Sequence, residues 1–251
     1  MSAWLEGRVI ENRYWTDTLF SLRVASPPVR FEAGQFVRIA LDTEKGNAGS
    51  RTARPFSFVN APADPVLEFY GVIVPEGPLS PLLVRLQAGD PLYIADNPSG
   101  FLVLAEVPPA EDLWLLATGT GIAPFLSILR TEVPWQRYRR VILVHGARHA
   151  KELVYQDMIQ AVADARGDRF VSIKFTTGEK TPDTLEGRIP AAIRDGRLEA
   201  AAAAAIAPER SQFMLCGNPG MLKDAAAELA LRGLRKNRRR TPGQITVESF
   251  W

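Results

Sequence analysis

The chain has 251 residues, of which 46% are hydrophobic and 23% are charged, and its net charge is only +2. This composition is typical of a globular protein, and so small a charge gives no argument for a nucleic-acid partner. A single cysteine, Cys216, excludes an internal disulfide and an all-cysteine iron–sulfur site, and the presence of only two histidines argues against a zinc site.

The sequence shows neither the apolar run of about 18 residues that a membrane helix needs nor a basic and apolar N-terminal signal. We therefore expect no membrane association and a location in the reducing cytoplasm.

Residues 1 to about 100 contain short, β-branched or alternating segments separated by turns rich in Gly and Pro. The expected strands are Thr18–Val24, Gln35–Leu41, Pro55–Asn60, Val66–Val74 and Pro91–Ala95. Many short strands at close spacing are typical of an antiparallel barrel or sandwich.

From about residue 111 the pattern becomes an alternation of strands and helices. The expected strands are Leu113–Ala117, Val141–His145, Phe170–Phe175, Phe213–Cys216 and Gln244–Glu248, and the expected helices are Gly121–Arg130, Lys151–Asp164, Pro190–Arg194 and Met221–Arg235. This alternation predicts a parallel sheet with helices on both faces. Two prolines within Glu106–Asp112 mark the linker, so we expect domains at 1–105 and 106–251. The six alanines of Ala200–Ala205 predict a surface helix or a loop insertion.

Two glycine-containing turns follow strands of this second half. Thr118–Gly121 stands between a strand and a helix, an order that delivers backbone N–H groups and a positive helix end to a phosphate. Its spacing is not GxGxxG, and a turn that binds nothing is the alternative. Cys216–Gly220 repeats the order and should lie beside the first turn at the carboxyl edge of the sheet. For Cys216 itself, inert packing is the alternative.

In the first half, Arg54-Pro55-Phe56-Ser57 brings an arginine, an aromatic ring and a hydroxyl together at the start of a strand. This predicts a ligand with an anionic part and a flat ring, and a strand with one solvent-exposed arginine is the alternative. Glu68–Tyr70 adds a second polar and aromatic strand. Gly77–Ser80 adds a turn that can present N–H groups to a pyrophosphate.

The C-terminal region carries a basic group and an aromatic pair. The basic group is Arg235, Lys236, Arg238, Arg239 and Arg240, and a smaller one is Arg137, Arg139 and Arg140. Such basic groups commonly form surfaces that only solvent contacts. Beside an active site they instead attract an acidic partner. The terminal Phe250-Trp251 either packs on the chain's own surface or stacks on a flat cofactor.

Taken in order, the Arg-x-aromatic-Ser segment, the Gly-x-x-Ser turn, ATGTGIAPF, CGNP and the terminal Glu-x-aromatic resemble the ferredoxin–NADP⁺ reductases. The resemblance spans essentially the whole chain and is closest to the bacterial flavodoxin/ferredoxin–NADP⁺ reductases. It implies an N-terminal antiparallel Greek-key β-barrel that binds FAD, followed by a parallel-sheet α/β domain that binds NADP(H). We expect a monomer.

The resemblance implies FAD contacts from both domains. Arg54 would neutralise the pyrophosphate, Ser57 would approach the flavin N5, and Phe56 stands where the family usually has tyrosine. Tyr70 would touch the flavin or its ribityl chain. The other implied contacts are Pro55, Pro78, Leu79, Ser80 and Thr120, with Phe250 over the flavin and Trp251 on the adenine.

The resemblance also implies the NADP(H) site. Arg148 and Arg188 would clamp the 2′-phosphate with their fixed forks of N–H donors. The other implied contacts are Thr118, Gly119, Gly121, Ala147, Thr177, Gly217, Asn218 and Pro219. Bacterial relatives often carry Ser-Arg-Glu where this chain has Thr177-Gly178-Glu179, which weakens the NADPH preference unless Lys174 or Lys180 compensates.

The implied reaction is hydride transfer from NADPH to FAD, followed by transfer of single electrons to ferredoxin or flavodoxin. Ser57, Cys216 and Glu248 would be its catalytic residues. The basic residues from Arg235 to Arg240 would receive the acidic carrier. Because Phe250 would cover the nicotinamide site, the C-terminal tail would gate turnover.

Alternatives remain at this point. An NADPH-dependent flavin reductase or diaphorase would keep the nucleotide loops without needing Trp251. A non-catalytic dinucleotide-binding module would bind no flavin. Related reductases with an iron–sulfur module or a globin domain are excluded by the single cysteine and by the length of the chain.

Overall fold

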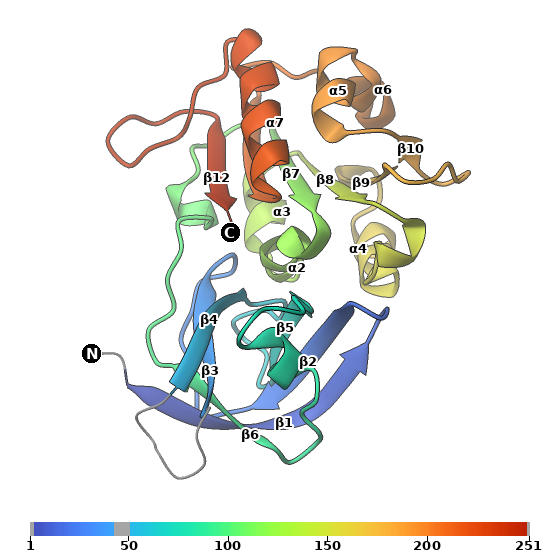
Figure 1. The fold of residues 1–251 in the computed structure, drawn as a ribbon. Coiled ribbons are helices and arrows are strands. Elements are labelled where there is room, and N and C mark those ends of the chain that lie inside the picture. The colour runs from blue at the N-terminus through green and yellow to red at the C-terminus, as the bar shows by residue number, and fades with distance from the viewer. Residues whose placement is uncertain (1–2, 43–50, 250–251) are drawn as a thin grey trace.

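The computed structural model describes residues 3–42 and 51–249, which form two domains, each built on one sheet (Figure 1). The strands of the first sheet are β1 (Trp4–Tyr14), β2 (Leu19–Ala25), β3 (Phe36–Asp42), β4 (Arg51–Ser57), β5 (Leu67–Val72) and β6 (Pro91–Ala95), and a short helix α1 (Ser80–Leu83) follows β5. The strands of the second sheet are β7 (Asp112–Thr118), β8 (Arg140–Ala147), β9 (Phe170–Thr176), β10 (Leu185–Glu186), β11 (Ser211–Gly217) and β12 (Ile245–Ser249).

The first sheet is antiparallel, with the strand order β4-β3-β6-β1-β2-β5. Its two outer strands meet, because Phe58, just after β4, bridges to Phe69 in β5, and the Val59 amide donates to the Glu68 carbonyl at 2.9 Å. This contact closes the sheet around a hydrophobic core that includes Phe20 and Ile39. The predicted antiparallel Greek-key barrel is confirmed.

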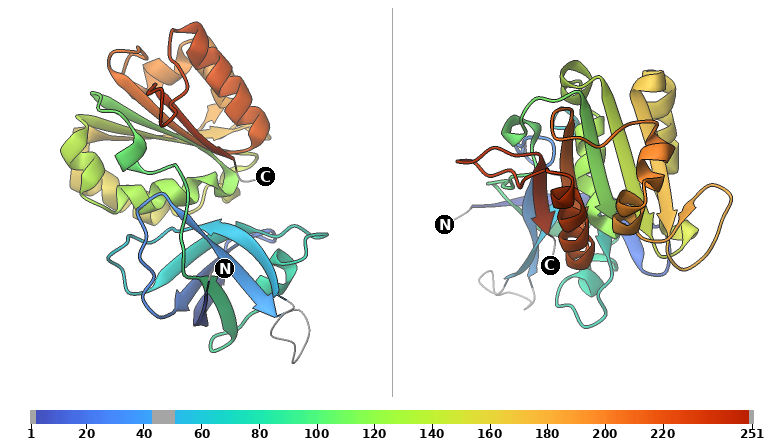
Figure 2. Two further views of the ribbon diagram at one scale, coloured as in Figure 1. Left: turned by 90° about the vertical axis from the view of Figure 1, so that its left-hand side faces the viewer. Right: turned by 90° about the horizontal axis from the view of Figure 1, so that it is seen from above.

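The second sheet is parallel, with the order β10-β9-β8-β7-β11-β12. Helices α2 (Ala123–Leu129), α3 (Val133–Arg137) and α4 (Gln156–Arg166) pack on one face, and α5 (Ile189–Arg194), α6 (Arg197–Ala202) and α7 (Pro219–Leu231) pack on the other (Figure 2). Alternate residues of β7 serve the two faces, with Leu113 and Leu115 in one cluster and Trp114 and Leu116 in the other. The predicted α/β arrangement is therefore confirmed.

Several element boundaries differ from the prediction. The helix expected from Lys151 begins only at Gln156, because Tyr155 has a left-handed backbone (φ 63°) that breaks the helix. The helix expected to reach Arg235 ends at Leu231, and Gly233 then turns the chain at φ 85°. The alanine run is less exposed than expected, because Ala202 and Ala204 pack in the core beside α5.

The segment between Ala95 and Asp112 joins the two sheets and is tied to the second domain. The Arg137 guanidinium donates to the carbonyls of Leu104 and Val107, the latter at 2.7 Å. The Asn237 side chain donates to the Glu106 carbonyl at 2.7 Å. Among the described residues, no helix combines the length and the apolar character that crossing a membrane requires.

Candidate functional site

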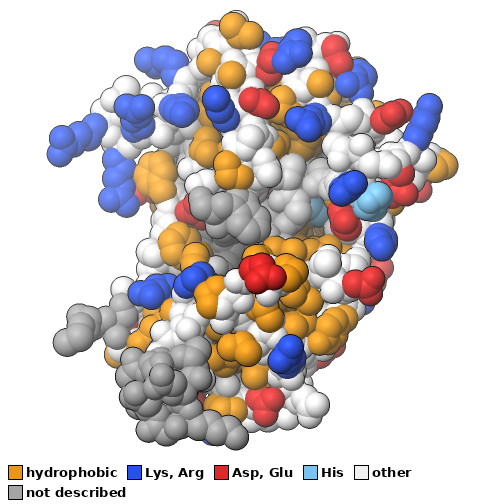
Figure 3. Space-filling model, viewed as in Figure 1, with side chains coloured by type: hydrophobic (Ala, Val, Ile, Leu, Met, Phe, Trp, Pro, Cys, Tyr) orange, Lys and Arg blue, Asp and Glu red, His pale blue; other side chains and the backbone are white. Residues whose placement is uncertain are grey.

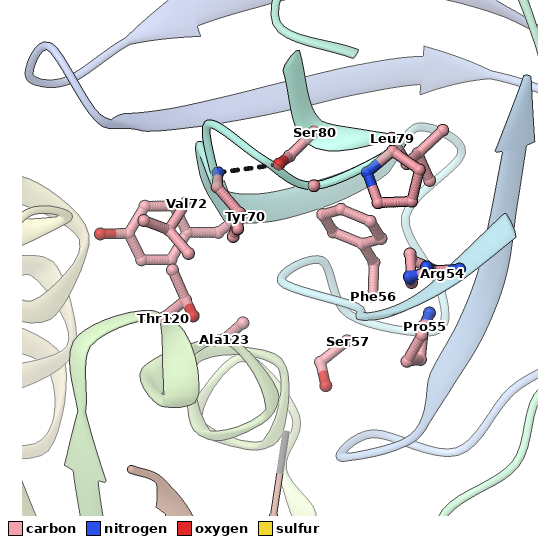
Figure 4. A pocket seen from close by; sticks show the side chains of 14 residues that line it. Arg54, Pro55, Phe56, Ser57, Tyr70, Val72, Leu79, Ser80, Thr120 and Ala123 are labelled. Carbon is pink, nitrogen blue, oxygen red and sulfur yellow. Dashed lines mark hydrogen bonds between the residues drawn. The ribbon is translucent and has the colours of Figure 1, made fainter. Parts of the chain in front are cut away.

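A cavity of about 470 Å³ lies where the barrel meets the second domain. It is lined by Arg54, Pro55, Phe56, Ser57, Tyr70, Gly71, Val72, Val74, Gly77, Pro78, Leu79, Ser80, Thr120 and Ala123. Thr120 comes from the turn after β7, Ala123 begins α2, and the other lining residues come from the barrel (Figure 4). The fold thus brings together in one cavity all nine sequence-predicted flavin contacts that fall among the described residues. Phe250 and Trp251 lie outside the described residues.

Gly71 leaves the space that the Phe56 ring occupies in the wall of this cavity. A Cβ at this position would stand 2.9 Å from Phe56 Cε1 and 3.0 Å from Phe20 Cζ. The absence of a side chain therefore lets the Phe56 ring lie across the barrel surface, and in Figure 4 it projects between Arg54 and Tyr70. Gly71, Val72 and Val74 were not predicted as site residues. The glycine inside the β5 pattern was the available signal, since strand glycines often mark a close approach.

Two buried hydroxyls among the lining residues have no partner within the described part of the chain. The hydroxyls of Ser57 and Tyr70 are buried and make no hydrogen bond within the described part of the chain. Burial also raises the pKa of the Tyr70 hydroxyl. The Ser80 hydroxyl is already engaged, since it accepts a hydrogen bond from the Val74 amide at 2.9 Å and so fixes the turn between β5 and α1 (Figure 4). Unpaired buried hydroxyls are costly unless a ligand pairs with them.

The two predicted turns of the second domain pack directly on each other. A Cβ on Gly217 would stand 2.4 Å from Thr118 Oγ1, and a Cβ on Gly121 would stand 2.5 Å from the Cys216 carbonyl oxygen. The Asn218 amide donates to Thr118 Oγ1 at 2.9 Å. These glycines are needed because only bare backbones fit at this distance, and their contact sets the spacing between the ends of β7 and β11.

Cys216 and Glu248 stand opposite each other on β11 and β12. Burial, reinforced by the Glu248 carboxylate, raises the pKa of the Cys216 thiol well above its ordinary value. Burial likewise raises the pKa of Glu248 to about 7, although the amides of Phe101 and Leu102 donate to its carboxylate and oppose the shift. Glu248 Oε1 has no partner in the described chain.

Glu248 and Ser57 approach the same part of the barrel. Phe36 pairs with Ser57 and bridges to Ser99, and Gly100 follows Ser99. A Cβ on Gly100 would stand 3.0 Å from Glu248 Oε2 and 3.3 Å from the Phe36 ring. Glu248, which pairs with Cys216 in the parallel sheet, therefore lies next to the barrel segment that pairs with Ser57.

A buried histidine forms a hydrogen bond with the first turn. His145, at the end of β8, is 1% exposed, and its Nε2 lies 3.0 Å from the Gly119 carbonyl oxygen. Burial lowers the pKa of His145 to about 4, so the ring is neutral at physiological pH and Nε2 carries the proton that it donates. Sequence reasoning did not assign this residue, because a lone buried histidine has no distinguishing pattern.

A second cavity, of about 370 Å³, opens at the carboxyl edge of the parallel sheet. It is lined by Thr118, Gly119, Gly146, Ala147, Arg148, Glu152, Phe175, Thr177, Gly187, Arg188, Ile189, Pro190, Asn218, Gly220, Met221 and Asp224. Seven of these were predicted nucleotide contacts: Thr118, Gly119, Ala147, Arg148, Thr177, Arg188 and Asn218. Gly121, Gly217 and Pro219 are not among the lining residues, and the first two instead hold the turns together. The acidic Glu152 and Asp224 were missed, since no spacing rule identifies them.

Gly178, where the resemblance leads us to expect an arginine, follows the lining residue Thr177. Its amide donates to the Arg148 carbonyl at 2.8 Å, and a Cβ there would approach that carbonyl oxygen to the same distance. A larger residue at 178 would therefore displace the Arg148 backbone. Lys174 and Lys180, one of which would have to compensate for the absent arginine, are not among the described residues that line the cavity.

The predicted basic group lies away from both cavities, on the loop between α7 and β12. Figure 3 shows Lys and Arg side chains gathered at the upper left, over this loop. Arg235, Lys236 and Arg238 line a groove beside α7. Arg239 is held differently, because it pairs with Glu106 at 3.2 Å.

Comparison with known proteins agrees with this geometry. Residues 115–227 match the family model of the oxidoreductase NAD-binding domain. The chain is 42% identical to the flavodoxin/ferredoxin–NADP reductase of Shigella flexneri over the full length of both. It is 36% identical to the ferredoxin–NADP reductase of Pseudomonas aeruginosa, covering 96% of this chain and 95% of that one. A crystal structure of a ferredoxin NADP⁺ reductase from Neisseria gonorrhoeae, with bound FAD and NADP, matches 100% of both chains with a TM-score of 0.93 at 33% identity. This chain is therefore a member of the flavodoxin/ferredoxin–NADP reductase family.

Proposed function

We propose that this protein binds FAD in the cavity of Arg54 and Tyr70, binds NADP(H) in the cavity of Arg148 and Arg188, and moves electrons between NADPH and ferredoxin or flavodoxin. The observation that carries the proposal is the single cavity lined by the barrel segment Arg54–Ser57 and by Thr120 of the nucleotide turn. Bound FAD would supply the ability to take two electrons as a hydride and release them singly.

The lining residues fit a flat ring with an anionic tail. Phe56 and Tyr70 offer ring surfaces, and the unpaired Ser57 hydroxyl offers a hydrogen bond at the inner end. Arg54 is exposed, and among the described residues it donates only to the Ala53 carbonyl and forms no ion pair, which leaves its guanidinium available for a pyrophosphate. Pro55, Pro78, Leu79, Ser80 and Thr120 would complete the contacts.

Three residues would act at the reacting atoms. Ser57 would hydrogen-bond the flavin edge, and Cys216 would stay a neutral thiol and support the nicotinamide ring by contact. Glu248 holds or releases a proton near neutral pH, since its pKa is about 7. It would therefore exchange protons with the site without a large energetic penalty.

The second cavity supports a phosphorylated dinucleotide. Arg148 and Arg188 are exposed cations at its rim and would bind the 2′-phosphate of NADPH. Thr118, Gly119, Ala147, Thr177 and Asn218 would form the rest of the site, and Gly121, Gly217 and Pro219 would shape the turns around it. The other charged residues that line the cavity, Glu152 and Asp224, are acidic. The preference for NADPH over NADH would therefore depend on Arg148 and Arg188.

The remaining assignments rest on the family to which the chain belongs. Arg235, Lys236, Arg238, Arg239 and Arg240 would bind an acidic one-electron carrier, and Phe250 and Trp251 would cover the flavin and the adenine. The boundary between the FAD and NADP(H) domains would fall near residue 105. The enzyme would work as a monomer in the cytoplasm.

The test is the absorption spectrum of the purified protein, followed by anaerobic titration with NADPH and with NADH. We expect flavin bands that NADPH bleaches at lower concentration than NADH does. Replacing Arg148 and Arg188 by alanine should weaken the binding of NADPH at least tenfold and leave the affinity for NADH within twofold of wild type. Arg194→Ala, an exposed arginine on α5 that pairs with Glu228, is the matched control. A protein that takes up no FAD would overturn the proposal.

A further inference from the structure

Tyr155 occupies an unusual position between the domains. It precedes α4 in a left-handed conformation (φ 63°, ψ 21°), which only one other non-glycine residue, Ala203, shares as a positive φ in the described chain. A bulky side chain rarely adopts this conformation, and it persists only where surrounding contacts fix it. The Tyr155 side chain is nonetheless 7% exposed, so it is strained and buried at once.

The contacts that hold Tyr155 come from the barrel. Its hydroxyl donates to Glu68 Oε1 in β5 at 2.8 Å. Its ring lies 4.8 Å from the Trp15 ring and meets the Tyr70 ring edge-on, with centroids 5.4 Å apart at 79°. Arg13 covers Trp15 from outside, 3.6 Å above the ring centroid. A residue of the second domain is thus enclosed by barrel side chains on several sides.

Glu68 is itself fixed in place from both domains. Its amide donates to Asn60 Oδ1 at 2.9 Å, and its second carboxylate oxygen lies 3.8 Å from Arg130 of the second domain. Arg130 also pairs with Asp64 at 2.8 Å. The acceptor of the Tyr155 hydroxyl is therefore largely enclosed, with a side chain only 17% exposed.

Tyr155 reaches the flavin cavity through Tyr70. The Tyr70 ring lines the first cavity, while its hydroxyl has no partner in the described chain that would hold the ring. The Tyr155 ring packs against the Tyr70 ring in a T-shaped contact, with centroids 5.4 Å apart. Tyr155 itself lines a separate cavity of about 520 Å³, together with Trp15, Glu68 and Arg130 among others, whereas Tyr70 lines the first cavity.

We propose that Tyr155 is a positioning residue for electron transfer: it ties the second domain to Glu68 and fixes the Tyr70 wall against the turn of Thr118–Gly121. This rests on the proposed function, because it assigns the cavity beside Tyr70 to the flavin. The Tyr155 hydroxyl bond fixes the relative position of the domains, and the ring contact fixes the cavity wall.

Three single variants test the role. Tyr155→Phe removes only the hydroxyl, Glu68→Gln retains an acceptor for it, and Tyr138→Phe removes another buried tyrosine hydroxyl that has no partner in the described chain. We measure the hydride-transfer rate in single turnovers at saturating NADPH, the KM for NADPH, and the visible circular dichroism of bound flavin. We also measure amide hydrogen exchange of residues 59–72 in the flavin-free protein.

We expect Tyr155→Phe to slow hydride transfer threefold or more, alter the flavin dichroism and speed exchange in residues 59–72, with the KM for NADPH within twofold. The hydride-transfer rate of Glu68→Gln should stay within twofold of that of wild type. Tyr138→Phe should match wild type in all four measurements. If Tyr155→Phe matches Tyr138→Phe in all of these readouts, Tyr155 has no positioning role. If the wild-type protein binds no FAD, the proposed function fails, while the exchange comparison still decides whether Tyr155 ties the domains together.

Discussion

Glu248 should make the stability of this protein fall as the pH rises through neutrality. Its carboxyl is raised from an ordinary pKa of 4.5 to about 7, chiefly by burial. Between these two values the folded state keeps a proton that the unfolded state has released, so raising the pH favours unfolding. The stabilisation is complete below pH 4.5 and lost by about pH 7, and a shift of this size corresponds to about 3 kcal/mol. Glu248→Gln removes the titration while keeping an acceptor for the amides of Phe101 and Leu102.

The assay is urea unfolding of wild type and Glu248→Gln at intervals from pH 4 to pH 9. We expect the two to be alike near pH 4 and the variant to be more stable above pH 7, by up to the same 3 kcal/mol. Glu76→Gln, an exposed glutamate in the turn after β5, is the control and should follow the wild type. Contributions from groups that Glu248 does not perturb cancel in the difference between variants. If the curves of wild type and Glu248→Gln run parallel across this range, the burial argument for Glu248 is wrong.

Three further outcomes follow from the structure. Asp112 is 0% exposed and paired with Arg140 and Arg210, so Asp112→Ala should destabilise the fold by about 3–5 kcal/mol in urea unfolding, because two partly buried cations lose their partner. Asn218→Ala should cost about 1 kcal/mol, since its side chain caps the Gly220 and Met221 amides at the start of α7, and smaller losses than a few tenths would contradict the capping role. His145, whose pKa burial lowers to about 4, should show no imidazole titration by NMR between pH 8 and pH 5, whereas a midpoint near 6.5 would refute its burial.

The order of strands and helices could be predicted because the hydrophobic pattern changes at the linker. The first strand, β1, escaped prediction even though it has 11 residues, since its sequence WLEGRVIENRY is rich in charge and only Gly7 and Val9 in it are buried. The true start of α4 was equally hidden, because the left-handed Tyr155 is imposed by contacts with the barrel rather than by a local helix-breaking residue. Local sequence therefore predicts the elements that bury one face. It does not predict a break such as the one before α4, which depends on contacts between distant residues.

The candidate site divides in the same way. Residues with a motif, such as Arg54 and Arg148, were predicted and line the expected cavities. His145 carries no motif, and only the fold brings it beside the Gly119 carbonyl. Glu68 belongs to a segment that the sequence singled out, but only the fold shows that it accepts from the Tyr155 hydroxyl. Side chains that position the site are chosen by their neighbours in space, so a single sequence cannot reveal them.

The sequence and the structure give different reasons for the glycines of the two turns. From the sequence, Gly121 and Gly217 read as room for a phosphate. In the fold, a Cβ on either would collide with the opposite turn, at 2.5 Å from the Cys216 carbonyl oxygen or 2.4 Å from Thr118 Oγ1. Since no neighbouring backbone can move that far without shifting β7 or β11, these glycines first set the separation of the strand ends. The two interpretations are compatible, because the closeness of the turns is what presents Thr118 and Asn218 to a single cavity.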